Sequence, residues 1–170
     1  ARRLANWRSP LIGEYEELDG LAIADLVRKG EFSALEVLET AIGLVEERNP
    51  ALNAIVATLF DEAHHAVEIG LPDGPLAGVP YVFKELVVSV LGTPATSASR
   101  LYADNQPEAE SEIVTRCRRA GLVVLGKTNS SEFGLQPVTE SHLFGPARNP
   151  WNLDHSPGGS SGGSASAVAA

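Results

Sequence analysis

The chain has 170 residues, of which 44% are hydrophobic and 21% are charged, a composition typical of a folded globular protein and not of a disordered one. Its formal net charge of −9 argues against broad nucleic-acid binding, which needs a basic surface to neutralise phosphates. No window is apolar enough to span a membrane, and residues 1–8 lack the apolar core of a secretory signal, so we expect a cytoplasmic protein without nucleic-acid or membrane partners.

Two helices are predicted near the start of the chain. Asp19 can cap a first helix, which Gly30 ends. Ser33-Ala34-Leu35-Glu36 forms a capping box, and apolar residues then recur at helical spacing until Asn49-Pro50 stops the pattern. We therefore expect the second helix to end at this proline.

A strand and a third helix follow. Residues 52–59 are rich in branched apolar residues and predict a strand, and residues 61–69 predict an amphipathic helix. That helix carries two adjacent histidines, which point to different faces and cannot form the i, i+4 metal pair, so we expect them on the surface or partly buried. No metal or organic cofactor is implied, because none of the histidines shows ligand spacing. The four histidines are His64, His65, His142 and His155.

An apolar run around Lys84 is the next feature. Residues 76–80 lead into it, and residues 81–88 contain only Lys84 and Glu85 as charged residues. A lysine in such a run is costly to bury unless it is paired or neutral, which makes Lys84 a candidate functional residue. The alternative is an edge-strand lysine with its ammonium group in water.

Residues 93–106 are polar and rich in turn formers, and residues 110–120 predict a helix that Gly121 ends. Cys117, the single cysteine, lies in this helix and can form neither an internal disulfide nor a metal site. Residues 122–125 predict a short buried strand. A helix followed by a strand favours α/β architecture with parallel pairing.

The residues directly after that strand are candidates for a substrate pocket, because open α/β sheets place ligands beyond the carboxyl ends of their strands. The candidates for the pocket wall are Thr128, Asn129, Ser130, Ser131, Glu132 and Phe133. An ordinary helix start with Ser130 or Ser131 as its cap is the alternative, and both interpretations can hold together.

The richest motif lies at residues 157–164, where four glycines and three serines follow one proline. A glycine-rich turn before a helix can aim several N–H groups and hydroxyls at one point. A flexible linker is the alternative, although the flanking residues are not linker-like. A phosphate-binding loop is excluded because no lysine follows Lys127. Gly159-x-Ser161-x-Gly163 matches a nucleophile elbow, but residues 152–157 are not the buried strand that such an elbow needs.

Taken together, four motifs resemble those of the amidase signature family, weakly before residue 50 and strongly over residues 76–170. The motifs are Gly78-Val79-Pro80 with Lys84, Gly126-Lys127-Thr128-Asn129, Arg148-Asn149-Pro150-Trp151-Asn152, and residues 158–164. The resemblance implies an α/β amidase-signature fold, with a mixed, largely parallel central sheet flanked by helices. Residues 1–170 would be the N-terminal part of one such domain, with residues 1–70 as a mainly helical lead-in and residues 71–170 as the start of the catalytic core. Residues 164–170 form a helical run without a stop signal, so we expect a fragment cut within a helix.

The resemblance also implies a Ser–cis-Ser–Lys triad. Lys84 matches the general base, and Ser160 matches the serine that follows a cis peptide bond, here the bond from Gly159. The nucleophilic serine of the family lies roughly two dozen residues beyond Ser160, past Ala170, so we expect this segment alone to be inactive. Residues expected to support the loop are Gly158, Gly159, Ser161, Gly162, Gly163 and Ser164. One departure is Glu85, where the family usually has aspartate.

The activity implied is amide hydrolysis without a cofactor, on a small-molecule amide. Residues 148–152 look most like those of bacterial amidases that act on aryl amides or on linear or cyclic oligoamides. Two alternatives stay open: the glutamine-hydrolysing subunit of a tRNA-dependent amidotransferase, and a non-catalytic interaction module whose Gly/Ser stretch is a linker. A homo-oligomer is also left open.

Overall fold

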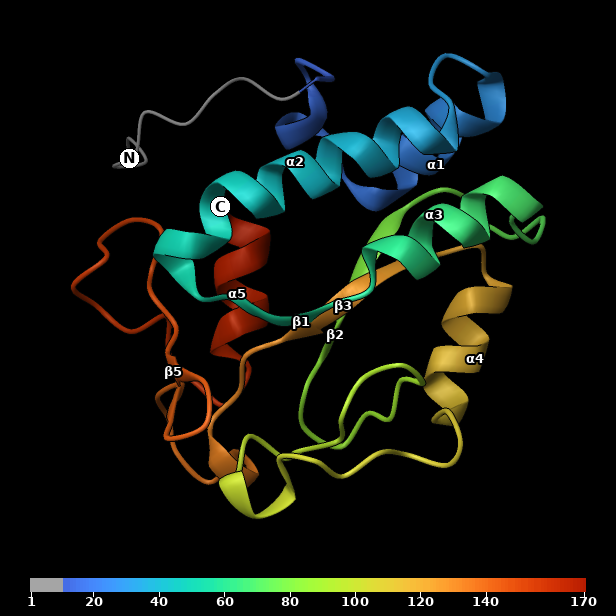
Figure 1. Ribbon diagram of the computed structural model, residues 1–170. Coiled ribbons are helices and arrows are strands. Elements are labelled where there is room, and N and C mark those ends of the chain that lie inside the picture. Colours follow the sequence, from blue (N-terminus) through green and yellow to red (C-terminus); the bar gives the residue numbers. More distant parts are fainter. Residues whose placement is uncertain (1–10) are drawn as a thin grey trace.

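The computed structural model describes residues 11–170, so the expected absence of a secretory signal in residues 1–8 lies outside the described residues. The described chain is a mixed α/β structure with helices on both faces of a small sheet (Figure 1). Its elements are η1 (Tyr15–Glu17), α1 (Gly20–Lys29), α2 (Ala34–Leu52), β1 (Ile55–Thr58), α3 (Phe60–Ile69), β2 (Pro80–Lys84), η2 (Arg100–Tyr102), α4 (Glu112–Arg119), β3 (Val123–Thr128), η3 (Glu132–Gly134), β4 (Glu140–Ser141), β5 (Gly145–Pro146) and α5 (Gly162–Ala169). Within this range no helix has both the length and the apolar character that crossing a bilayer requires.

The caps predicted for α1 and α2 are confirmed. The Asp19 carboxylate accepts a hydrogen bond from the Ala22 N–H at 2.8 Å, and Gly30 ends α1 with a left-handed φ of 72°. Ser33 begins α2 with a complete capping box, in which its hydroxyl and the Glu36 carboxylate each bond the other residue's backbone N–H. Both helix starts are therefore fixed by local side-chain chemistry.

The predicted end of α2 is wrong, because the helix continues past Pro50 to Leu52. Proline lacks the backbone donor that a helix interior needs, yet the last turn is closed by other groups. The Asn53 N–H donates to the Asn49 carbonyl at 2.8 Å. The Asn49 side-chain oxygen accepts the N–H groups of Ala54 and Ile55 at 2.9 and 2.8 Å. Asn49 thus joins the end of α2 to β1.

The main sheet has three strands in the order β1-β3-β2. The central strand β3 is antiparallel to β1 and parallel to β2, which confirms a mixed sheet. β3 is longer than predicted, because Gly126, Lys127 and Thr128 also pair with both neighbours. A side chain at Gly126 would place its Cβ 2.1 Å from the Ala57 carbonyl oxygen. Close approach of β1 therefore requires glycine there, which interrupts the apolar pattern that the prediction relied on.

The two faces of the sheet bury different parts of the core, because side chains alternate along a strand. Val123 and Leu125 pack with apolar residues of α2 and α3, which lie above the sheet in Figure 1. Val124 and Phe83 pack with Leu59, and also with residues of α4 and of the preceding loop. The end of β2 consequently lies between two packed layers.

Candidate active site

Lys84 and Ser160 meet although 76 residues separate them in the sequence. The Lys84 Nζ donates a hydrogen bond to the Ser160 Oγ at 2.7 Å. Lys84 is the last residue of β2 and is partly buried, and this burial lowers the pKa of its ammonium group. This arrangement therefore favours an uncharged Lys84 amine in contact with the Ser160 hydroxyl. An exposed lysine would keep its charge more readily.

Thr139 holds the Gly/Ser turn from one side. Its fully buried hydroxyl donates to the Gly158 carbonyl at 2.9 Å and accepts from the Gly162 N–H at 3.0 Å. The peptide bond between Gly159 and Ser160 is cis, as the resemblance implies. The Ser160 carbonyl accepts the Ser131 N–H at 3.3 Å. These contacts fix both sides of the turn. A flexible linker would not make such contacts.

The first turn of α5 packs directly against β3. Gly163 is buried, and a Cβ there would lie 2.4 Å from the Asn129 backbone nitrogen and 2.5 Å from the Ala54 carbonyl oxygen. The hydroxyls of Ser164 and Thr128 share a hydrogen bond of 2.6 Å. This hydrogen bond ties the start of α5 to the end of β3. The exposed Ser161 hydroxyl makes no hydrogen bond to any part of the described chain.

The six residues predicted as a pocket wall differ in exposure, and Ser131 contacts Ser160 through a backbone hydrogen bond of 3.3 Å. Thr128, Asn129, Ser130 and Ser131 are buried, Glu132 is half-buried, and Phe133 is 43% exposed. The alternative of an ordinary capped helix start is wrong, because only the short turn η3 follows Ser131, no side chain caps it, and Phe133 has a left-handed φ of 51°. A role of these six residues in a substrate pocket stays a prediction.

Sequence reasoning missed a buried ion pair behind the site. The side chains of Glu85 and Lys127 are 2% and 0% exposed, and Lys127 Nζ lies 3.7 Å from Glu85 Oε1. Burial lowers the pKa of Lys127, and the Glu85 carboxylate opposes this shift. The signal that could have found the pair is two opposite charges at the ends of adjacent apolar strands, since buried charges need partners.

Thr139 was missed as well. It stands alone in a polar, turn-rich segment, and no periodicity or charge distinguishes it there. Only the tertiary structure brings it against residues 158–162.

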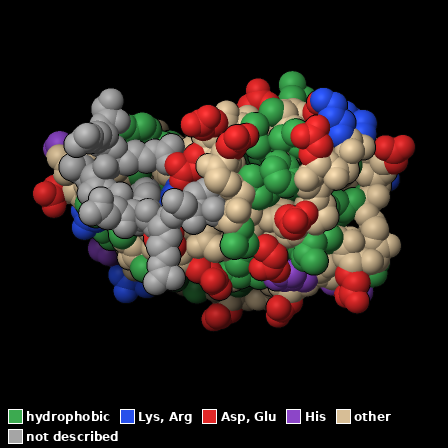
Figure 2. Space-filling model, turned by 90° about the horizontal axis from the view of Figure 1, so that it is seen from above, with side chains coloured by type: hydrophobic (Ala, Val, Ile, Leu, Met, Phe, Trp, Pro, Cys, Tyr) green, Lys and Arg blue, Asp and Glu red, His purple; other side chains and the backbone are tan. Residues whose placement is uncertain are grey.

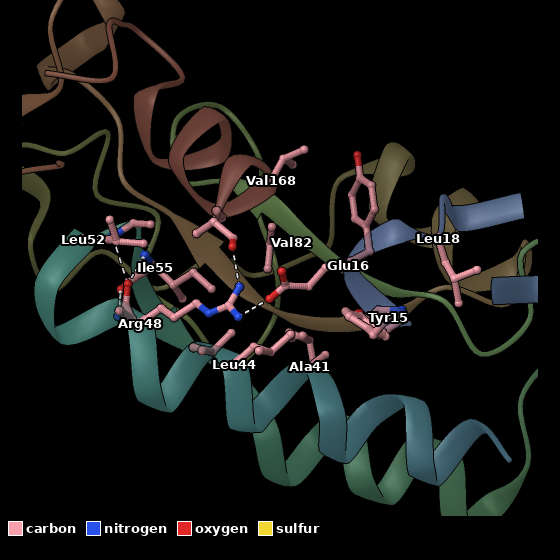
Figure 3. Close-up of a pocket in the computed structure, with 18 residues that line it drawn as sticks. Tyr15, Glu16, Leu18, Ala41, Leu44, Arg48, Leu52, Ile55, Val82 and Val168 are labelled. Carbon is pink, nitrogen blue, oxygen red and sulfur yellow. Dashed lines mark hydrogen bonds and ion pairs between the residues drawn. The ribbon is translucent and has the colours of Figure 1, made fainter. Parts of the chain in front are cut away.

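A groove of about 280 Å³ lies elsewhere, between α2, α5 and the sheet (Figure 3). It is largely apolar, and its lining includes Leu44, Val82 and Val168. Figure 3 shows the Arg48 guanidinium at one side, where it donates to the Glu16 carboxylate. None of the predicted site residues lines this groove, so it is distinct from the contact of Lys84 with Ser160.

The two histidines of α3 lie where the sequence places them. His64 is partly buried, and its ring nitrogens lie 2.7 Å from the Phe60 carbonyl oxygen and 2.6 Å from Glu39 Oε1. His65 is exposed. Across residues 11–170 no three His, Cys, Asp or Glu side chains are grouped so that they could hold a metal ion.

Comparison with known proteins gives one family match, to the family described as Amidase, over residues 36–170. The chain is 47% identical over 154 residues to the 6-aminohexanoate-cyclic-dimer hydrolase of Paenarthrobacter ureafaciens, covering 89% of the chain. It is 42% identical over 148 residues to one of the subunits of the glutamyl-tRNA(Gln) amidotransferase of Halothermothrix orenii, covering 87% of the chain.

Among solved structures, the chain is similar to that of 6-aminohexanoate cyclic dimer hydrolase complexed with substrate. The TM-score is 0.85 at 44% identity, over 90% of this chain and 32% of the other. The chain covers 31% of the length of each of the two curated relatives. It therefore spans about a third of such proteins.

Proposed function

Since the chain belongs to the amidase family, we propose that the full-length protein hydrolyses the C–N bond of a carboxylic amide through an acyl-enzyme. The observation that carries this proposal is the hydrogen bond of 2.7 Å from Lys84 Nζ to Ser160 Oγ. It joins a partly buried lysine with a lowered pKa to the serine that matches the middle member of the family's triad.

In this mechanism the uncharged Lys84 amine acts as the general base. It accepts the Ser160 hydroxyl proton, while Ser160 takes a proton from the nucleophilic serine, which lies beyond residue 170. The nucleophile's oxygen bonds to the amide carbonyl carbon. When the C–N bond breaks, the proton returns from Lys84 through Ser160 to the leaving nitrogen. Water then hydrolyses the acyl-enzyme by the same proton route and frees the nucleophile.

The surrounding turn would keep Ser160 in place during these steps. Gly158, Gly162 and Thr139 fix the turn from one side, and Ser164 ties α5 to Thr128. We assign Thr128, Asn129, Ser130, Ser131, Glu132 and Phe133 to the substrate pocket. The hydrogen bond of 3.3 Å from the Ser131 N–H to the Ser160 carbonyl supports this assignment.

As substrates we propose small amides of the oligoamide or aryl-amide type. The similarity to a 6-aminohexanoate-cyclic-dimer hydrolase at 47% identity supports a cyclic or linear oligoamide first. A panel of the cyclic dimer, its linear counterpart and a nitroanilide, assayed with the full-length protein, would rank these classes by kcat/KM.

The decisive test compares the full-length protein with its Lys84→Ala and Ser160→Ala variants. We expect each variant to lose about a hundredfold or more in kcat, because each breaks the proton path. Lys29→Ala, which removes an exposed lysine paired with Asp25 on α1, is the control and should keep full activity. Near wild-type rates in both site variants would remove the assignment.

A second candidate is the glutamine-hydrolysing subunit of a tRNA-dependent amidotransferase. The identity of 42% to one of the subunits of a glutamyl-tRNA(Gln) amidotransferase supports it. Glutaminase activity that requires co-purifying subunits would favour this candidate, whereas hydrolysis of small amides by the isolated protein would favour the first.

Four further expectations stay predictions. We infer that residues 1–170 belong to one domain, and core clusters that combine residues from before and after residue 70 support this. We propose a cytoplasmic location, which cell fractionation tests.

We also propose that the protein has no nucleic-acid partner. Asp and Glu side chains, which are spread over the face shown in Figure 2, support this proposal. Homo-oligomerisation is left open, and a sedimentation measurement would test it.

A further inference from the structure

The Glu85–Lys127 pair lies at the end of β2 and on β3, on the opposite side of the sheet from Ser160. Lys84 and Glu85 are neighbours, so their side chains point to opposite faces. Lys84 reaches Ser160, whereas Glu85 turns toward Lys127 and residues 94–98. The mechanism proposed above uses neither Glu85 nor Lys127, although both are buried charges at the edge of the site.

The pair is bonded to one short loop, residues 94–98. Glu85 Oε1 accepts from the Thr96 N–H and from its hydroxyl, both at 2.7 Å. Glu85 Oε2 accepts from the Ala98 N–H at 2.8 Å. Lys127 Nζ donates to the Pro94 carbonyl at 2.8 Å. Both charges thus direct their hydrogen bonds to the same five residues.

The backbone of this loop needs such contacts. Ser97 and Ala98 have φ values of 53° and 54°, in the left-handed region that residues with a side chain seldom adopt. Conformations of this kind persist only where the surrounding structure imposes them. In this loop the Glu85 carboxylate bonds the residues on either side of Ser97.

The loop in turn touches the segment beside the candidate catalytic serine. The Ser97 carbonyl accepts the Phe133 N–H at 3.0 Å. The Gly134 N–H donates to the Ser131 carbonyl at 3.0 Å, and the Ser131 N–H donates to the Ser160 carbonyl at 3.3 Å. Continuous hydrogen-bonded contacts therefore run from the ion pair through residues 94–98 and 131–134 to Ser160.

We propose that the Glu85–Lys127 pair is a positioning element of the active site: it fixes residues 94–98, which hold residues 131–134 against Ser160. The catalytic part of this inference rests on the proposed amide hydrolysis. Glu85 and Lys127 touch no reacting group, so they act on turnover only through the loop. Contact along a path does not by itself show coupling, and the experiment must measure it.

The experiment uses the full-length protein and the variants Glu85→Gln and Glu85→Asp. Glu85→Gln keeps the shape but leaves the Lys127 charge buried without a counter-charge. We expect kcat to fall by about tenfold or more with a smaller change in KM, since the loss is in positioning. Glu85→Asp keeps the carboxylate on a shorter side chain and should recover part of kcat. Glu112→Gln, which breaks an exposed pair with Arg116 on α4, is the control and should match the wild type.

Amide hydrogen exchange supplies a readout that needs no turnover. In Glu85→Gln we expect faster exchange at residues 96–98 and also at residues 133–134, while α4 exchanges as in the wild type. Wild-type exchange at residues 133–134 would overturn the proposal, and so would wild-type kcat in Glu85→Gln. If Glu85→Gln does not fold, the double variant Glu85→Gln/Lys127→Met removes both buried charges. Full protection and full kcat in that variant would equally overturn the proposal.

The two readouts separate this inference from the proposed function. A wild-type protein that hydrolyses none of the amides would remove the proposed function, and exchange would still decide whether the pair orders residues 131–134. An active wild type with an unaffected Glu85→Gln variant would remove only the positioning role.

Discussion

At the scale of single residues, Lys84 predicts the pH dependence of the proposed reaction. Burial lowers its pKa, and only the uncharged amine can accept a proton. We expect kcat/KM of the full-length protein to rise with pH through an inflection below the ordinary lysine value of about 10.4. A pH–rate profile measures this, and a rate that is flat or falls with rising pH over this limb would contradict it.

Lys84→Arg sharpens the same prediction, because a guanidinium stays protonated in proteins. The variant should be inactive across the whole accessible pH range. Lys29→Arg, at an exposed ion pair on α1, should keep the wild-type profile.

Thr139 gives a second prediction at this scale. Thr139→Val keeps the shape but removes the hydroxyl that bonds Gly158 and Gly162. Each buried polar group left unpaired costs about 1–3 kcal/mol, so we expect lower stability and a lower kcat. Chemical denaturation and steady-state kinetics measure the two effects. Thr40→Val, which loses one bond within α2, should reduce stability less and leave kcat unchanged.

The contact between Lys84 and Ser160 could be predicted only through the family resemblance. No local pattern encodes a contact across 76 residues, and an apolar run alone also fits an edge-strand lysine. The pairing of Glu85 with Lys127 could have been predicted from the sequence, because two opposite charges lie at the ends of adjacent apolar strands. The role of Thr139 could not have been predicted, since no sequence pattern distinguishes an isolated threonine in a polar segment.

At the scale of elements, the close packing of α5 against β3 predicts the effect of added volume. Gly163→Ala would place a methyl group 2.4 Å from the Asn129 backbone nitrogen. Overpacking of this kind costs about 1–3 kcal/mol, so we expect a lower unfolding temperature of the full-length protein. Gly43→Ala is the control, because a Cβ at this position in α2 meets no atom within 4 Å and alanine favours helix. An unchanged or raised unfolding temperature in Gly163→Ala would contradict the packing described above.

His64 joins α3 to α2 in a pH-dependent way. Its hydrogen bond to Glu39, and next its bond to the Phe60 carbonyl, raise the pKa of His64. A raised folded-state pKa gives a stabilisation that is complete below the unfolded value of about 6.5 and is lost as pH rises through the folded value. His64→Gln should therefore lower stability at pH 5 and much less at pH 9, by a small amount because both side chains are partly exposed. Denaturation at both pH values tests this, with the exposed His65→Gln as control.

Local signals were enough for most helices and failed where tertiary contacts decide. The caps of α1 and α2 bond groups within four residues, so the sequence contains all that they need. The end of α2 depends instead on Asn49, which bonds residues 53–55. The length of β3 depends on Gly126 and Lys127, whose partners lie in β1 and β2.

At the scale of the whole molecule, we expect residues 1–170 alone to be unable to catalyse amide hydrolysis. The chain spans about a third of the length of the relatives it matches, and the mechanism proposed above assigns only two of the three triad members, Lys84 and Ser160, to residues 1–170. We expect residues 1–170, expressed separately and checked for folding by circular dichroism, to show no amide hydrolysis where the full-length protein is active. Turnover by the segment that is lost in Lys84→Ala would show that the nucleophile lies within these 170 residues.

The family and the mixed α/β architecture were predictable from the sequence, because the motifs fall in a characteristic order. The two layers around β3 were not, since they follow from which residues of one strand face α2 and which face α4. The groove between α2 and α5 could not be predicted from the sequence either, because its lining comes from many separate segments.

The opposite directions of Lys84 and Glu85 have a consequence for changes in chain length. Inserting or deleting one residue within β2 would turn Lys84 to the opposite face, and a deletion would present the Glu85 carboxylate to Ser160 in place of the amine. Residues 80–85 should accordingly accept side-chain replacements of similar shape far more readily than a gain or loss of one position.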